Sequence, residues 1–182
     1  MELERWEIDS GHSGIHFSVR HMVVAKVRGQ FSRWTGSYVA EDGDLGRASV
    51  NVVIDASSIE TGAADRDKHL RSADFFDAAN NPEITFQGTR VENLGGGRLR
   101  LTGDLTIRAV TRSVVLDVEY AGQTKDPWGN VRAGFTAKTS VERKDFGLGW
   151  NQVLEAGGVL VGERVDIEIE VEAVKQTASK AA

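Results

Sequence analysis

The chain has 182 residues, with 27 acidic and 22 basic side chains, so its formal net charge is −5. This mildly acidic balance argues against a nucleic-acid partner, because contacts to phosphates need a basic surface. The absence of cysteine excludes disulfides, thiolate nucleophiles and thiolate metal sites. The length suits one large β domain or two small ones.

Neither a signal peptide nor a membrane span is expected. Residues 1–6 have no basic region followed by an apolar one, as a signal peptide would. Nowhere do about 18 apolar residues follow one another, as a membrane-spanning helix requires. We therefore expect a cytoplasmic protein that does not span a membrane.

The first strand is expected over residues 15–21, where Ile15, Phe17 and Val19 alternate with polar side chains. By the same parity His21 falls on the apolar side, at the end of the strand. The apolar run that follows, residues 22–25, has no clear period, and we expect it to cover an edge or an opening.

A second strand is expected over about residues 26–40, but its apolar positions change phase. Val27 and Phe31 are odd-numbered, whereas Trp34 and Tyr38 are even-numbered. A slip of one residue within a strand indicates a β-bulge. The turn sequence at 41–44 then leads to a third strand, whose apolar positions are Ala48, Val50, Val52 and Ile54.

A short helical segment is expected near residues 64–77, in the middle of the chain. Residues 64–71 are too polar for a core helix, so this helix should lie on the surface. Pro82 then prevents Asn81 from continuing a helix. The adjacent Phe75 and Phe76 cannot both face one side of a strand, and we expect them to lie over the end of a sheet.

Five further strands follow with clear alternation. Strand four carries Ile84 and Phe86. The next four place their apolar residues at 99–107, 114–120, 131–141 and 165–171. Residues 175–182 are small and polar, and we expect a flexible tail there.

Eight strands joined mostly by hairpin turns predict one antiparallel sheet with one apolar face, closed as a barrel or folded as a sandwich. An eight-stranded barrel can fill its interior with side chains or hold one ligand. Small inward positions, Ala48, Gly88, Gly103, Ala133 and Ala137, indicate room for a long apolar guest. The alternative is that they only fit the taper of the barrel.

The polar residues of this pattern give little support for catalysis. His12 and Ser13 lie close to Asp9 in sequence, but catalytic triads are assembled from distant segments. His12 and His16 could share a face and bind a metal, but no third ligand is evident, so we expect no metal site. His21 is the exception, because a polar ring on an apolar face needs a partner. It is either a satisfied histidine at the rim or a donor to the head group of a lipid-like ligand.

Several segments together resemble the YceI-like family, in the right order and over about residues 5–174. They are WEID at 6–9, HSGIHFSVRH at 12–21, VRGQF at 27–31, SADFFD at 72–77, NPEITF at 81–86, LTIRAVTR at 105–112 and RKDFGLGW at 143–150. The resemblance implies a single domain over 1–182, an all-β, extended, eight-stranded antiparallel lipocalin-like barrel. It also implies a pore that holds a polyisoprenoid or an isoprenoid quinone for storage, transport or sequestration. Family members often form dimers, so a homodimer is possible, and no catalytic residues or cofactors come with the family.

We therefore expect a lipid-binding barrel that is not an enzyme. By strand parity, and with the end-closing residues added, the predicted ligand contacts are Phe17, Val19, His21, Met22, Phe31, Phe75, Phe76, Phe86, Leu101, Leu105, Ile107, Leu116, Phe135 and Trp150. One alternative is a ligand-free structural or interaction module whose barrel is filled by its own side chains. The other is an enzyme that acts on an isoprenoid, for which the expected inward residues offer only His21 as an acid or base.

Overall fold

The structure, a computed structural model, describes residues 1–152, 154 and 160–177. Antiparallel strands dominate this part of the chain, with one short α-helix, α1 (Ala64–Arg71). Three 3-10 turns lie at Ser10–His12, Ala56–Ser58 and Arg143–Phe146. The strands are β1 (Leu3–Ile8), β2 (Gly14–His21), β3 (Ala25–Phe31), β4 (Trp34–Glu41), β5 (Asp44–Asp55), β6 (Ile59–Glu60), β7 (Glu83–Gly95), β8 (Arg98–Ile107), β9 (Val110–Lys125), β10 (Val131–Glu142) and β11 (Val161–Lys175).

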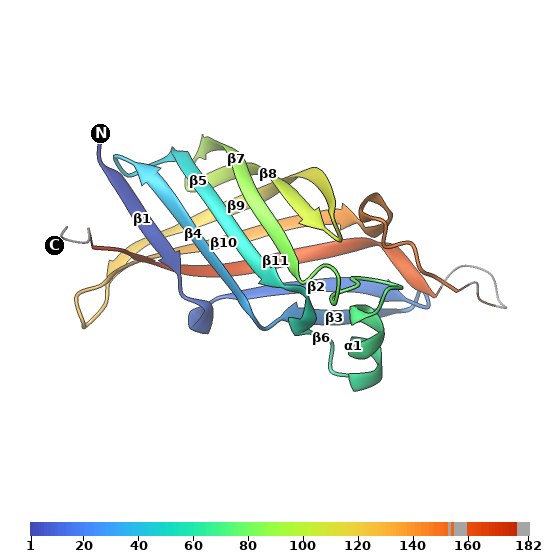
Figure 1. Cartoon of the computed structure of the whole chain (residues 1–182). Coiled ribbons are helices and arrows are strands. Elements are labelled where there is room, and N and C mark those ends of the chain that lie inside the picture. Colours follow the sequence, from blue (N-terminus) through green and yellow to red (C-terminus); the bar gives the residue numbers. More distant parts are fainter. Residues whose placement is uncertain (153, 155–159, 178–182) are drawn as a thin grey trace.

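Eight of these strands close into a ring. The order around it is β1-β4-β5-β7-β8-β9-β10-β11, and β11 pairs back onto β1. Trp6 lies at this closure, opposite Tyr38 of β4 on one side and Lys175 of β11 on the other. The predicted all-β, eight-stranded antiparallel barrel is therefore confirmed (Figure 1).

Two places in the ring are each occupied by two short strands instead of one long strand, namely β1 with β2 and β4 with β3. β1 and β2 pair with different parts of the long strand β11, and the turn at Ser10–His12 separates them. β3 pairs with β2, whereas β4 pairs with β1. The bulge predicted from the phase change between Phe31 and Trp34 is wrong, because the strand breaks at Ser32 and Arg33 between β3 and β4; the register shift in β4 lies between Val39 and Glu41. The phase change in the sequence comes from this break.

Helix α1 and the segment after it lie at one end of the barrel, beside β3 and β6 (Figure 1). Every residue of α1 is at least partly exposed, as its polar sequence predicts. The following turn places Phe75 inside, at 6% exposure. Backbone hydrogen bonds from Phe76 to Leu70 and from Ala78 to Arg71 hold the turn against the helix. The prediction that the phenylalanine pair lies over the end of the sheet is confirmed.

The small inward residues do not all leave open space. A side chain at Gly103 would overlap the ring of Phe86, and one at Gly88 would lie 3.0 Å from Leu101 and Val50. Ala133 is fully buried beside Trp6. At these positions the interior is filled by neighbouring side chains, as in the taper interpretation, whereas Ala48 and Ala137 border a cavity.

The described residues bear on two further predictions, the flexible C-terminal tail and the absence of a membrane-spanning helix. Lys175 is the last residue of β11, and the amide of Gln176 donates to the carbonyl of Arg5. The flexible tail predicted from 175 is therefore wrong at its start, and residues 178–182 lie outside the described part. Among the helices of the described residues, none has the length and hydrophobicity needed to cross a bilayer.

Candidate functional site

The barrel contains a cavity of about 610 Å³ whose walls are almost wholly apolar. This volume lies within the range of pockets that bury small-molecule ligands. The alternation of the strands creates the cavity, because every second side chain points inward. Thirteen of the predicted contacts border it, namely Phe17, Val19, His21, Phe31, Phe75, Phe76, Phe86, Leu101, Leu105, Ile107, Leu116, Phe135 and Trp150. Their contact with a ligand stays a prediction.

Met22 is the predicted contact that lies outside the cavity walls. It belongs to the loop between β2 and β3, where its side chain is 48% exposed and its φ is 53°. Met22 is predicted as an end-closing residue and not by strand parity, because β2 ends at His21 and alternation does not decide where a loop side chain points.

Aromatic rings close one end of the cavity. Tyr38 borders the cavity, and its ring stacks on Trp6 with centroids 5.6 Å apart and planes 9° apart. The ring of Phe135 meets Tyr38 edge-on at 5.6 Å. Trp6 is 2% exposed and Tyr38 7% exposed, and burial raises the pKa of the Tyr38 hydroxyl above its ordinary value. The stack forms a rigid apolar floor where β1 closes the barrel.

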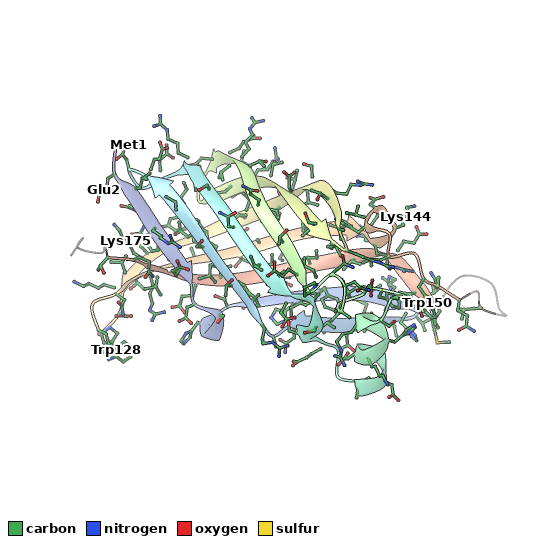
Figure 2. The ribbon with its side chains drawn as sticks, in the orientation of Figure 1. Met1, Glu2, Trp128, Lys144, Trp150 and Lys175 are labelled. Atoms are coloured by element: carbon green, nitrogen blue, oxygen red, sulfur yellow. The ribbon has the colours of Figure 1, made fainter. Side chains whose placement is uncertain are left out.

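The other end of the cavity is polar and reaches the surface. Exposed residues of β2 and α1, namely Arg20, Asp65 and Arg66, are among its walls. Trp150 lies at this end, opposite the end that carries Trp128 (Figure 2). Long apolar walls with polar groups at one end suit a ligand with a long apolar tail and a polar head.

His69 lies at this open end, although the sequence assigned its helix to the surface. Its Nε2 is 2.8 Å from Oδ2 of Asp74. Its ring meets Trp150 edge-on at 4.6 Å and Phe75 edge-on at 5.1 Å. An eight-residue helix with charges on all sides gives no periodic signal that could have identified this inward residue.

Arg143 is a second residue that sequence reasoning missed. Its side chain borders the cavity and is 5% exposed. Among the residues that the structure describes, its guanidinium donates hydrogen bonds only to backbone carbonyls, those of Leu148, Trp150, Val161 and Gly162, at 2.6–3.2 Å. Burial lowers its pKa below the ordinary value. Arg143 therefore fixes the chain around Trp150 onto the start of β11 and shapes the open end.

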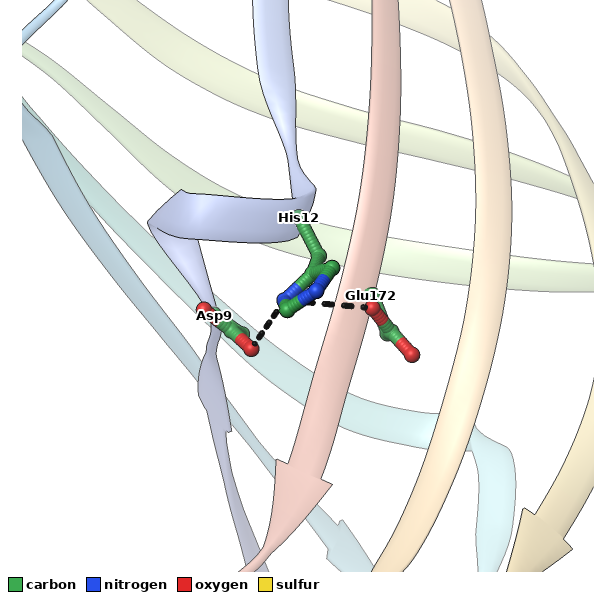
Figure 3. Close-up of side chains that lie close together, drawn as sticks. All are labelled: Asp9, His12 and Glu172. Atoms are coloured by element: carbon green, nitrogen blue, oxygen red, sulfur yellow. Dashed lines mark hydrogen bonds and ion pairs between the residues drawn. The ribbon is translucent and has the colours of Figure 1, made fainter. Parts of the chain in front are cut away.

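A cluster on the outer surface consists of Asp9, His12 and Glu172 (Figure 3). Nδ1 of His12 lies 2.8 Å from Asp9 and 3.8 Å from Glu172. Arg132 supplies a positive charge there, with its guanidinium 3.0 Å from Asp9 and 2.8 Å from Asp126. The single charge of Arg132 thus offsets part of the negative charge of these carboxylates, and the cluster links β1, β10 and β11 as an ion-pair network. His16, considered as a second ligand beside His12, is not part of it.

The hydroxyl of Ser13 has a structural role. It accepts a hydrogen bond from the amide of Glu172 at 2.9 Å and lies 3.4 Å from the Glu172 carbonyl oxygen. It therefore ties the start of β2 to β11. His12 therefore pairs with Asp9, whereas Ser13 pairs with the backbone of Glu172. The three residues do not form a nucleophile with its base.

The fold and the cavity define a closed β-barrel with an internal apolar site that opens at one polar end. Residues 6–173 match the model of the YceI-like domain. Protein YceI of Escherichia coli O157:H7 is 38% identical over 165 residues, which cover 91% of this chain and 83% of that protein. The chain belongs to the YceI-like family.

Solved structures show the same fold. BcnA of Burkholderia cenocepacia superposes with a TM-score of 0.79 at 21% identity, over 91% of this chain and 98% of that one. A polyisoprenoid-binding domain from Saccharophagus degradans, implicated in plant cell wall breakdown, superposes with a TM-score of 0.68 at 16% identity. That match covers 94% of this chain and 98% of the other.

Proposed function

We propose that the protein binds a long-chain isoprenoid-type lipid, a polyisoprenoid or an isoprenoid quinone, in the barrel cavity for storage, transport or sequestration. The observation that carries this proposal is the apolar cavity of about 610 Å³, which has polar residues of β2 and α1 among its walls. Membership of the YceI-like family supports it. The polyisoprenoid-binding domain with the same fold adds support for the ligand class.

The size and chemistry of the walls suit such a tail. Each buried methylene contributes about 0.8 kcal/mol, so a five-carbon unit contributes about 4 kcal/mol before the costs of ordering and association are subtracted. Affinity then increases with the number of enclosed units. The few polar groups at the open end contribute selectivity rather than most of the affinity.

The ligand is expected to enter with its tail toward the aromatic floor at Tyr38 and Phe135. Its head group then lies at the open end, beside His21 and His69. His21 ends β2 and borders the cavity, which favours its interpretation as a head-group donor. Phe75 and Trp150, tilted against each other at 5.4 Å, would cover the first part of the tail.

Two alternatives are less well supported. A barrel filled by its own side chains does not agree with a cavity of this volume. An enzyme would need acid and base groups around a reacting atom, and His69 already shares its Nε2 with Asp74. We therefore propose a binding protein rather than an enzyme. Its cytoplasmic location and its homodimer stay predictions.

A direct test is ligand uptake by delipidated protein. The probes are polyprenols of graded length and palmitate, followed by tryptophan fluorescence, because Trp34 and Trp150 border the cavity. We expect saturable binding of the polyprenols that tightens with chain length and exceeds that of palmitate. Equal affinity for all lengths, or no saturable response, would contradict the proposal.

A further inference from the structure

The loop between β2 and β3 exposes three consecutive apolar side chains. Met22 is 48% exposed, Val23 64% and Val24 87%. Large apolar side chains this exposed and contiguous indicate a contact surface rather than a folding requirement. The loop is short, since His21 and Ala25 already face each other across the hairpin.

The backbone of this loop is strained. Met22 and Val23 have φ values of 53° and 67°, the left-handed region that favours glycine and asparagine. A β-branched residue such as Val23 is a clear outlier there. Asparagine and glycine would suit this turn better, so the apolar side chains are retained at a cost to stability. Such strain is typical of functional positions.

Basic side chains stand directly behind the apolar tip. Arg20 and Lys26 face each other across β2 and β3, and Arg28 follows on the same side of β3. All three are exposed. Within the residues that the structure describes, none of the three takes part in an ion pair. An apolar tip with a basic collar is complementary to a bilayer whose surface carries anionic head groups.

The tip is continuous with the open end of the cavity. His21 and Arg20, which precede it, border the cavity. The amide of Met22 donates to the carbonyl of Leu160 at 2.8 Å, and Leu160 is also a wall residue. The loop thus stands beside the opening through which a tail would pass.

We propose that the loop at residues 22–24, with Arg20, Lys26 and Arg28, docks the protein onto an anionic lipid bilayer with the cavity mouth toward the membrane. Three side chains are too few for a specific protein interface, which buries about 800 Å² on each partner. They are enough for a shallow wedge at the boundary of head groups and acyl chains. Docking itself is independent of the cavity, whereas exchange of lipid at the docked mouth rests on the proposed function.

The experiment is co-flotation of the full chain with phosphatidylcholine vesicles, with and without about a third of phosphatidylglycerol. We expect binding that requires the anionic lipid and weakens with salt. The double variant Val23→Asn/Val24→Ser and the double variant Arg20→Gln/Lys26→Gln should each weaken it at least tenfold. Trp128→Ser is the matched control, because Trp128 is 83% exposed in a hairpin at the opposite end (Figure 2), and it should bind like the wild type.

Three outcomes would overturn the proposal. The first is wild-type affinity for vesicles in the loop variant, and the second is an equal loss of affinity in Trp128→Ser. The third is a wild-type chain that does not bind vesicles but binds a protein partner, with that binding lost in the loop variant. A folding defect is separable, because asparagine tolerates the φ of Val23, so the urea midpoint of the loop variant should not fall. Leu105→Glu, which blocks the cavity, should still float with anionic vesicles, so failure of docking and failure of the lipid-binding proposal give different results.

Discussion

Filling the cavity from one wall should weaken lipid binding by an amount that follows from the structure. Ala137 lies in β10, is 7% exposed and borders the cavity. Its neighbours across the sheet are Val118 and Ile169. Ala137→Phe adds six ring carbons to this wall, which take up about the room of one five-carbon unit of a tail.

Excluding one such unit removes about 4 kcal/mol of burial at about 0.8 kcal/mol for each methylene. At 1.4 kcal/mol for each factor of ten, the limit is a loss of about a thousandfold. A tail that bends or withdraws recovers part of this, so we expect a loss between about tenfold and about a thousandfold. The assay is titration of delipidated protein with a polyprenol, followed by tryptophan fluorescence.

Val115→Phe is the control for this variant. Val115 lies in the neighbouring strand β9 and is 47% exposed, so the same ring is added to the outer surface. We expect its affinity to equal that of the wild type. Unchanged affinity in Ala137→Phe, or an equal loss in both variants, would refute the assignment of the cavity as the binding site.

Three further predictions concern the cavity wall, the ion-pair network and the filled interior. Leu105→Glu places a carboxylate among apolar walls, where burial of a charge costs several kcal/mol, so organic extraction of the variant should yield no isoprenoid; lipid at the wild-type level would contradict the wall assignment. Arg132 lowers the pKa of Asp126 to about 2, so this pair stabilises the fold fully above about pH 4 and the contribution is lost as the pH falls through about 2. The urea midpoint of the wild type should therefore fall more steeply between pH 5 and pH 2 than that of Arg132→Gln, and parallel curves would count against it. Gly103→Ala should lower the free energy of unfolding by about 1–3 kcal/mol, because its Cβ would overlap the ring of Phe86 and the backbone carbonyl of Gln87; an unchanged urea midpoint would contradict this close packing between β7 and β8.

Strand parity predicts much of this cavity because a barrel converts period-2 alternation directly into an inside and an outside. Phe17 and Val19 of β2, and Leu101 and Leu105 of β8, lie on the walls for this reason. The same rule gives no prediction where alternation stops. Met22 follows the end of β2, and parity cannot place a loop side chain.

Other features depend on contacts between distant segments. β1 carries one buried residue, Trp6, and the alternation of its sequence is too weak to predict a strand, yet it closes the barrel. His69 faces the opening because its helix packs against the chain around Trp150. Gly103 has no room because the ring of Phe86 and the backbone carbonyl of Gln87 in the neighbouring strand β7 approach it closely, and no pattern in the sequence contains this contact.

Native mass spectrometry of the purified protein, combined with organic extraction of its contents, tests whether the barrel carries a long isoprenoid tail. We expect bound species that differ by the mass of five-carbon units, together with an extract that contains an isoprenoid. The protein stoichiometry of the same ions tests the predicted homodimer. Two results together would contradict lipid binding in the barrel. The purified protein would show only the apo mass and a lipid-free extract, and delipidated protein incubated with a polyprenol would also show only the apo mass.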